Sequence, residues 1–262
     1  MISIRHCSGF DDFEACVQLQ VETWGYDESE LIPRKTFLLA QKIGGQVVGA
    51  FDTHPANSQS PEQPESLVGF AMSLPGVKTE SGQARPYLHS HMLAVREGYR
   101  NRGLGVKLKR EQRLEAISRG IFHMEWTFDP LEIKNAFLNI HRLGAVVRSY
   151  RPDFYGVSSS RLQGGLPTDR LVAEWWLDTP RVIAAIQGSP VTPQEDQEQI
   201  VVPAAIYQWK ADDRHRDRAR EVQAENRRRF QQAFAEGLAV VAFTRDAEGN
   251  GTFHLGRWSE PA

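Results

Sequence analysis

Several features are scarce in this sequence of 262 residues, and each scarcity excludes a class of protein. Only two cysteines occur, Cys7 and Cys16, so a disulfide-stapled scaffold is excluded and a reducing cytoplasm is the expected compartment. No apolar run approaches the roughly 18 residues that a membrane helix needs, and we expect neither a membrane partner nor a secretory leader. The formal net charge is only -2, which gives no global attraction for nucleic acid.

Hydrophobic residues are not scarce. They make up 40% of the chain and charged residues 24%, as in ordinary folded enzymes and binding proteins. A chain of this length buries a hydrophobic core that needs no disulfides or structural metals to be stable. No internal repeat of useful length is visible.

The periodicity of apolar residues predicts a fixed order of elements in the first 156 residues. A polar segment at 55–66 separates two of the predicted strands, and we interpret it as a hairpin loop. The predicted strands are 2–6, 44–54, 67–74, 87–95, 121–130 and 145–156. The first predicted helix follows strand 2–6 and has Phe13, Cys16, Val17, Gln20 and Trp24 at helical spacing, and the later helices are 33–42, 103–119 and 131–143. Meandering strands followed by crossover helices predict an α/β (α+β) fold with a mixed, mostly antiparallel sheet flanked by helices.

Beyond residue 156 the pattern predicts a separate C-terminal extension, 157–262. We expect a strand at 170–177, a proline-bearing polar linker at 189–199, an edge strand at 200–206, a long charged helix at 212–237 and a hairpin at 239–258. The domain prediction is therefore a core, 1–156, followed by a strand-helix-hairpin extension that packs on the core sheet or continues it.

The stretch REGYRNRGLGVKLKR, residues 96–110, holds four arginines, two lysines and three glycines between a predicted strand and a predicted helix. A helix start offers unpaired N–H groups and the positive end of the helix dipole, which suit an anion. Two glycine-loop motifs do not fit. The ATPase loop with its GKS or GKT ending is absent, and the dinucleotide pattern GxGxxG fails because Leu108 stands where its last glycine should be.

The remaining pattern is Arg-x-x-Gly-x-Gly, formed by Arg100, Gly103 and Gly105. Together with the preceding HMLAV and the later NAFLNIHRLGA, it resembles the pyrophosphate loop of the GCN5-related N-acetyltransferase (GNAT) superfamily, whose members bind acyl-coenzyme A (acyl-CoA). The resemblance covers about residues 1–156. It implies a GNAT-type sheet and acetyl-CoA, or another acyl-CoA, as the cosubstrate.

The resemblance also implies which residues hold that cosubstrate. Backbone groups of one set pair with the pantetheine arm, N–H groups of a second set hold the pyrophosphate, and a third set contacts the pantetheine from the later helix. These sets are Leu93, Ala94 and Val95; Arg100, Asn101, Arg102, Gly103, Leu104 and Gly105; and Asn135 and Asn139.

Acyl transfer to an amine needs a proton acceptor for the nucleophile. The strand 87–95 offers His89 and His91, of which His91 lies nearer the expected thioester, and both imidazoles have the alternative of being packed inside the sheet. Glu125 and Asp129 on the following strand are the other acceptors, although Asp129 equally suits a helix cap. The His-x-His spacing lacks an obvious third ligand, so no metal is expected.

The departing thiolate needs an acid, and here the sequence differs from the family. Many relatives carry a tyrosine four residues before the glycine that ends this helix, and that position is Ile140, ahead of Gly144. Tyr155, Tyr150 and water are the replacements we consider, and Tyr155 is the residue we assign to catalysis with His91 and Glu125. Either tyrosine could instead be a packed ring with a surface hydroxyl.

Arg148 and Arg151 flank Tyr150, and guanidinium groups suit carboxylates, so we assign both to substrate binding. Surface arginines without a ligand are the alternative. The longer pattern of WTFDPL, NAFLN, LGA, FYG and LPTDRL resembles a branch of large GNAT-like proteins, some of which are associated with N-acylamino acid racemases and with N-succinylation of amino acids.

The predicted function is transfer of an acetyl or succinyl group from acyl-CoA to the amine of a small carboxylated acceptor such as an amino acid, directly and without a covalent intermediate. The alternative is a non-catalytic acyl-CoA sensor or scaffold. The arginines of the long charged helix alternate with acidic residues, which favours a self-paired solvated helix over a nucleic-acid contact. The extension has two open roles, closing the active site or forming a homodimer contact.

Overall fold

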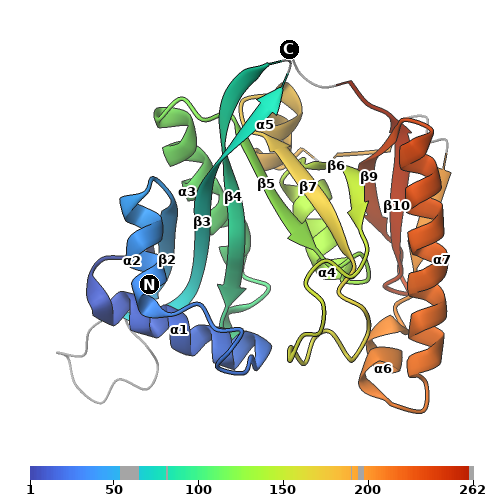
Figure 1. Cartoon of the computed structure of the whole chain (residues 1–262), viewed down its shortest axis with the longest axis horizontal. Coiled ribbons are helices and arrows are strands. Elements are labelled where there is room, and N and C mark those ends of the chain that lie inside the picture. Colours follow the sequence, from blue (N-terminus) through green and yellow to red (C-terminus); the bar gives the residue numbers. More distant parts are fainter. Residues whose placement is uncertain (54–64, 81, 190, 194–197, 260–262) are drawn as a thin grey trace. The chain divides into compact units, whose positions relative to one another are not determined.

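A computed structural model describes residues 1–53, 65–80, 82–189, 191–193 and 198–259. The chain divides into two compact units, Met1–Met124 and Glu125–Ala262, whose elements are labelled in Figure 1. Most of the polar segment 55–66, predicted to be a hairpin loop, lies outside the described residues. The expected division at 156 marks the end of the part that resembles a known family, whereas the two units are defined by their internal contacts. The division at 156 therefore stays a prediction.

The described residues of the first unit include β1 (Ile2–His6), β2 (Gln46–Asp52), β3 (Ser66–Glu80) and β4 (Gln83–Val95), which lie side by side in the order of the chain. Each strand pairs antiparallel with the next. β3 and β4 are longer than the apolar pattern predicts, because the ladder continues through exposed polar pairs such as Lys78 opposite Arg85.

Helices cover both faces of these strands. α1 (Gly9–Trp24) and α2 (Arg34–Lys42) pack on one face, where Phe13, Phe37 and Phe70 belong to one buried cluster. α3 (Leu104–Ser118) covers the other face, where its Leu104 and Leu108 pack with Val48, Ala50, Val68 and Ala71. The alternating side chains of β2 and β3 therefore supply two separate cores, which fix the end of β4 relative to the start of α3.

The buried side of α3 is partly polar, whereas the apolar Leu114 of this helix is 57% exposed. The buried residues are Leu104, Leu108, Lys109, Gln112 and Ala116. Polar residues can occupy this side because the facing strands supply partners for them.

Those partners form a buried polar layer. The Lys109 ammonium donates to the Ser90 hydroxyl at 2.7 Å, and Ser90 Oγ lies 3.1 Å from Gln112 Oε1. Gln46 donates from Nε2 to the Gln112 carbonyl at 2.8 Å and accepts from Ser73 at 2.9 Å. Burial lowers the pKa of Lys109 well below its ordinary value, because the charged form loses its water.

The described residues of the second unit contribute to six strands. The first is β5 (His123–Phe128), whose residues from Glu125 onward belong to this unit. The others are β6 (Val146–Arg151), β7 (Arg170–Trp176), β8 (Glu198–Val202), β9 (Leu238–Arg245) and β10 (Gly251–Arg257), in the spatial order β5-β7-β6-β9-β10-β8. Within this unit β9 pairs antiparallel with β6 at Val240 and Val147.

The helices of this unit depart most from the sequence expectation. The predicted helix 131–143 is α4 (Ile133–Ala136) followed by the π-helix η2 (Phe137–Arg142). α5 (Pro180–Ile186) and α6 (Ile206–Ala211) were not predicted, because both are short. The long charged helix is α7 (Arg216–Ala235), whose Phe230 is buried against Tyr150 and Phe253.

The expected α/β (α+β) fold class, a mostly antiparallel sheet flanked by helices, is confirmed. β8 ends the strand order, as expected of an edge strand. Across the described residues, no helix is both long and apolar enough to span a membrane.

Candidate active site

The glycine loop joins β4 to α3 in the first unit. It opens with one turn of 3-10 helix, η1 (Glu97–Tyr99), and then uses two left-handed residues, Asn101 with φ 60° and Gly103 with φ 75°. The first helical hydrogen bond of α3 runs from the Lys107 N–H to the Gly103 carbonyl at 3.1 Å. The N–H groups of Leu104, Gly105 and Val106 precede that bond and have no intrahelical acceptor, so this helix start can receive an anion.

Arginines reinforce this anion preference. Arg100 donates from Nε to the Val95 carbonyl at 3.0 Å, which ties the loop to the end of β4. The Arg102 guanidinium lies 5.2 Å from the Tyr99 ring centroid, and the Tyr99 hydroxyl donates to Asp52 at 2.8 Å. Within the described part of the chain, neither Arg100 nor Arg102 has a carboxylate partner, so both guanidinium charges are uncompensated at the helix start.

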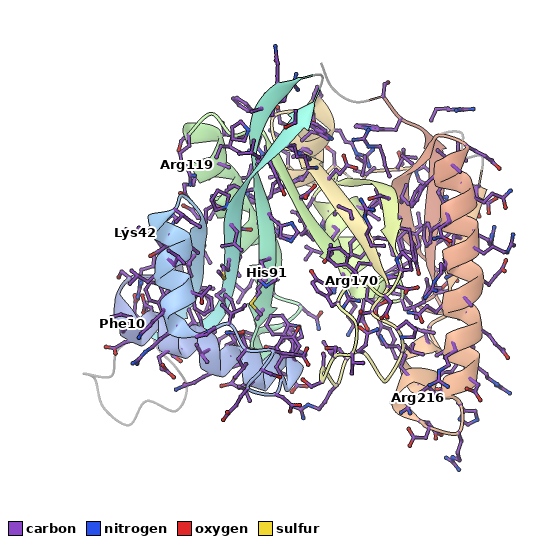
Figure 2. All side chains as sticks on the ribbon, viewed as in Figure 1. Phe10, Lys42, His91, Arg119, Arg170 and Arg216 are labelled. Atoms are coloured by element: carbon purple, nitrogen blue, oxygen red, sulfur yellow. The ribbon has the colours of Figure 1, made fainter. Side chains whose placement is uncertain are left out.

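His91 lies on β4 (Figure 2), at an irregularity of the strand. Met92 pairs with Met72 and Ser90 pairs with Ser73, so His91 is an extra residue that bulges from the ladder. Its ring centroid lies 6.2 Å from that of His89. Burial, and to a smaller extent the charge of His89, lower the pKa of His91, which keeps it neutral and able to accept a proton near pH 7.

The second unit brings a phenol onto β5. Glu125 and Thr127 are two residues apart on this strand, both partly exposed, so they share one face. The Tyr155 hydroxyl, carried by the loop after β6, lies 2.9 Å from the Thr127 hydroxyl. Tyr155 itself is 46% exposed. The Tyr155 hydroxyl therefore contacts the face of β5 that also carries Glu125.

Tyr150 is engaged differently. Its hydroxyl donates to the buried Asp169 carboxylate in a short hydrogen bond, and burial together with this bond raises its pKa. A phenol whose proton is held by a buried carboxylate is a poor proton donor to another group. Of the two tyrosines considered from the sequence, the geometry favours Tyr155 as a proton donor.

The position of the missing tyrosine is apolar. Ile140 is fully buried within η2, where i to i+5 geometry is seen at the Leu143 N–H, which donates to the Leu138 carbonyl at 3.0 Å. Single-turn π segments are frequent at functional sites. Asn135 is exposed on α4 and Asn139 is buried in η2, so Asn135 alone of the two is open to solvent.

Arg148 and Arg151, both assigned to substrate from the sequence, have different surroundings. Two nitrogens of the Arg148 guanidinium donate hydrogen bonds to the Glu174 carboxylate, Nε at 3.1 Å and Nη2 at 2.5 Å. Arg151 is exposed at the end of β6 and, among the described residues, has no ion pair. The fork of Arg148 is therefore already filled by a carboxylate of the same unit.

Asp129 binds the turn before α4 and does not cap that helix, because the N-cap position of α4 is Glu132. Its carboxylate accepts from the Leu131 N–H at 2.8 Å and pairs with Lys210 at 3.0 Å. Lys210 also pairs with Glu132 at 3.0 Å, and burial raises the pKa of Glu132. This buried ion cluster joins α6 to the turn after β5 and leaves Asp129 poorly suited to relay protons.

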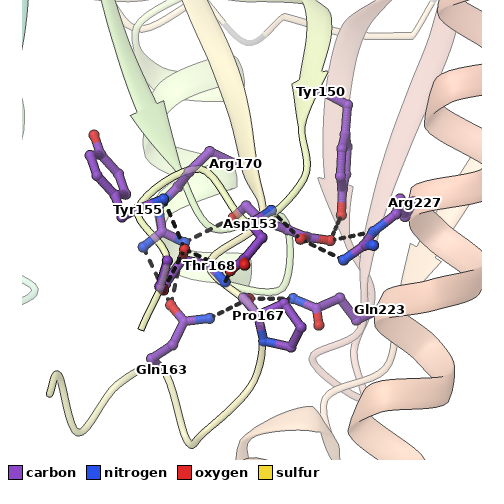
Figure 3. Close-up of polar contacts among 11 residues, drawn as sticks. Tyr150, Asp153, Tyr155, Gln163, Pro167, Thr168, Arg170, Gln223 and Arg227 are labelled. Carbon is purple, nitrogen blue, oxygen red and sulfur yellow. Dashed lines mark hydrogen bonds and ion pairs between the residues drawn. The ribbon is translucent and has the colours of Figure 1, made fainter. Parts of the chain in front are cut away.

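The loop that carries Tyr155 is held by α7, a relationship that no sequence signal indicated (Figure 3). Arg227 donates to both oxygens of Asp169, at 2.9 and 2.7 Å. Gln223 donates to the Pro167 carbonyl at 2.9 Å. Thr168 accepts from the Tyr155 N–H through its hydroxyl at 2.9 Å. α7 therefore supports the segment between β6 and β7 that carries Tyr155.

No three His, Cys, Asp or Glu side chains gather as a metal-binding group among residues whose placement is described. The chemistry that the described groups offer is anion binding at the loop of α3 and proton transfer at His91, Glu125 and Tyr155.

Comparison with solved structures confirms the fold that the GNAT resemblance predicts. Acetyl-CoA-bound NAA60 of Arabidopsis thaliana superposes with a TM-score of 0.55 at 15% identity, covering 68% of this chain and 100% of that one. NAA60 with a bisubstrate analogue gives 0.50 at 16% identity, covering 68% and 100%. The Escherichia coli ribosomal-protein-S18-alanine N-acetyltransferase gives 0.49 at 16% identity, covering 68% and 96%. No protein-family model and no curated protein matches the sequence.

Proposed function

We propose that this protein is an acyl-CoA dependent N-acyltransferase that moves an acetyl or succinyl group to the amine of a small carboxylated acceptor such as an amino acid. The observation that carries the proposal is the glycine loop at the start of α3, where left-handed Asn101 and Gly103 alternate with the uncompensated Arg100 and Arg102 just before the free helical N–H groups. Similar solved structures that contain acetyl-CoA support the choice of cofactor.

The proposed cofactor contacts follow the loop. N–H groups from Arg100 to Gly105 bind the pyrophosphate, and the arginine side chains add charge. Backbone groups of Leu93, Ala94 and Val95 bind the pantetheine arm, with Asn135 and Asn139 as further contacts. The Val95 carbonyl already accepts from Arg100, so Leu93 and Ala94 are the better candidates for that arm.

In the proposed reaction the amine nitrogen attacks the thioester carbonyl carbon, the new C–N bond forms and the C–S bond breaks, with no acyl-enzyme. His91 accepts the proton that the amine loses, because its lowered pKa keeps it neutral. Glu125 is the second acceptor, acting through water. Tyr155 gives a proton to the departing thiolate in place of the tyrosine that Ile140 replaces.

The test is release of free thiol from acetyl-CoA and succinyl-CoA, measured by a chromogenic thiol reagent against a panel of L- and D-amino acids. The proposal predicts release that depends on both the acyl-CoA and one class of amine. Mass spectrometry of the product must show the acyl group on nitrogen. Hydrolysis without amine dependence would contradict the proposal.

A second function has one specific observation in its favour. The buried Ile140 removes the usual acid, which would suit a protein that binds acyl-CoA without turnover. Tight CoA binding with no thiol release, across the full acceptor panel, would favour this sensor or scaffold.

A further inference from the structure

Arg170, the first residue of β7, is only partly exposed, and its charge has no carboxylate partner within the residues described. Two arginines of the same unit are paired, Arg148 with Glu174 and Arg227 with Asp169. Arg170 instead donates to neutral oxygens, the Asp169 carbonyl at 2.8 Å and Gln163 Oε1 at 3.3 Å. Its charge is left available for a ligand.

The guanidinium is nevertheless held in place. Gln163 is buried, and its Nε2 donates to the Pro167 carbonyl at 2.7 Å, which directs its Oε1 toward Arg170. Arg170 Nη2 also reaches Gln163 Oε1 at 3.3 Å. The guanidinium carbon lies 5.3 Å from the Tyr155 ring centroid, so the cation sits over the phenol proposed as the acid (Figure 3).

A second arginine lies directly opposite. Arg151 on β6 is the Cα partner of Arg170 on β7, and neither has an ion pair among the described residues. Like charges at opposite positions of neighbouring strands destabilise a sheet. The local carboxylates do not relieve this cost, because Asp169 is used by Tyr150 and Arg227, and Asp153 accepts from the Thr168 N–H at 3.1 Å.

We infer that Arg170, with Arg151 opposite, binds the carboxylate of the acceptor substrate, and that Arg148 does not. This inference rests on the proposed function and names the residue that recognises the carboxylate. Arg170 is well suited because a guanidinium forms paired hydrogen bonds with a carboxylate. Its place over Tyr155 brings the acceptor to the phenol that would protonate the leaving group.

The test compares free amino acids with their C-terminal amides in the thiol-release assay, using the full chain and the variants Arg170→Gln and Arg170→Lys. The wild type is expected to prefer the acid. In Arg170→Gln we expect kcat/KM for the acid to fall about 10- to 100-fold, with the amide nearly unchanged, because one charge-assisted pair is lost. Arg170→Lys should recover part of the preference. The matched control is Arg161→Gln, which replaces an exposed arginine in the segment before β7. This variant should leave kcat/KM unchanged for both the acid and the amide.

Each other outcome overturns the inference in a recognisable way. Equal losses for acid and amide would assign Arg170 a structural role, and a rise only in the KM for acyl-CoA would assign it to the phosphates. An unaltered acid preference in Arg170→Gln would remove it from the site. If the wild type releases no thiol with any amine, the proposed function fails instead. Calorimetry with N-acetylated amino acids and their amides then decides the subsite, which survives only if the acid binds more tightly and Arg170→Gln abolishes that difference.

Discussion

The Tyr155 hydroxyl lies 2.9 Å from the hydroxyl of Thr127, which places a phenol from the loop after β6 on the face of β5 that also carries Glu125. This contact connects the tyrosine-bearing loop to a regular strand. It is the reason that we propose Tyr155 as the acid in place of the tyrosine that the resembled family carries.

Tyr155→Phe should lower kcat without raising the KM for acyl-CoA. A positioned general acid contributes roughly 100-fold or more, and water can replace part of that, so a loss of about 10- to 100-fold is expected. Steady-state thiol release measures it. Thr127→Val is the companion variant, which removes only the partner hydroxyl and should cost less than Tyr155→Phe. Full activity in Tyr155→Phe would exclude the phenol as the acid.

Gly103→Ala should weaken CoA binding. Gly103 has φ 75°, and an added Cβ would meet nothing within 4 Å, so the whole cost, about 1 kcal/mol, comes from the left-handed backbone. Relaxation of that strain moves the N–H groups that face the pyrophosphate. Calorimetry should show a Kd raised several-fold.

Gly98→Ala is the matched control for this loop. Gly98 also has open space around its Cα but no positive φ, so an alanine fits without strain. Equal Kd values for the two variants would show that backbone geometry at Gly103 does not matter for binding.

The pH profile should report His91. A base must be neutral to act, and the pKa of His91 lies below its ordinary value of 6.5, so kcat/KM should rise with pH and reach half its maximum below pH 6.5. His89→Asn removes a neighbour whose charge lowers that pKa, so the midpoint should move upward. If the acid limb persists unchanged in His91→Gln, a different group is the base, and Glu125 is then the next to replace.

Arg227→Met should destabilise the protein, because it leaves the fully buried Asp169 carboxylate without its cation. Breaking a buried pair costs about 3–5 kcal/mol, and the one-third exposure of Arg227 reduces the expected loss to about 2 kcal/mol. The free energy of unfolding in urea measures it. Arg228→Met is the control, since Arg228 contacts Glu225 and Gln232 on the solvated side of α7 and its loss should leave stability unchanged. Equal stability of the two variants would contradict the role given to Asp169.

The sequence predicted those parts of the molecule that depend on neighbours in the chain. The glycine loop of 96–105, the strand before it and the helix after it follow from local backbone rules, and the structure places them in that order. The polar face of α3 did not follow, because Lys109 and Gln112 are buried against Ser90 and Gln46 from distant strands.

The support of the Tyr155 loop was also beyond prediction. Arg227 and Asp169 are 58 positions apart, and in the sequence Arg227 is one of several arginines in a charged helix. Only the folded arrangement distinguishes it from Arg228. The same holds for Arg148. Its partner Glu174 lies on the adjacent strand, 26 positions away in the sequence, so the sequence does not show that this arginine is already paired.

Calorimetric titration of CoA and acetyl-CoA into the full-length chain tests the central claim most directly. The account predicts one site, occupied by CoA, acetyl-CoA and 3'-dephospho-CoA but not by pantetheine, because the N–H groups at the start of α3 bind the diphosphate. Absence of binding by a folded protein to any CoA form, or equal binding of pantetheine, would contradict it.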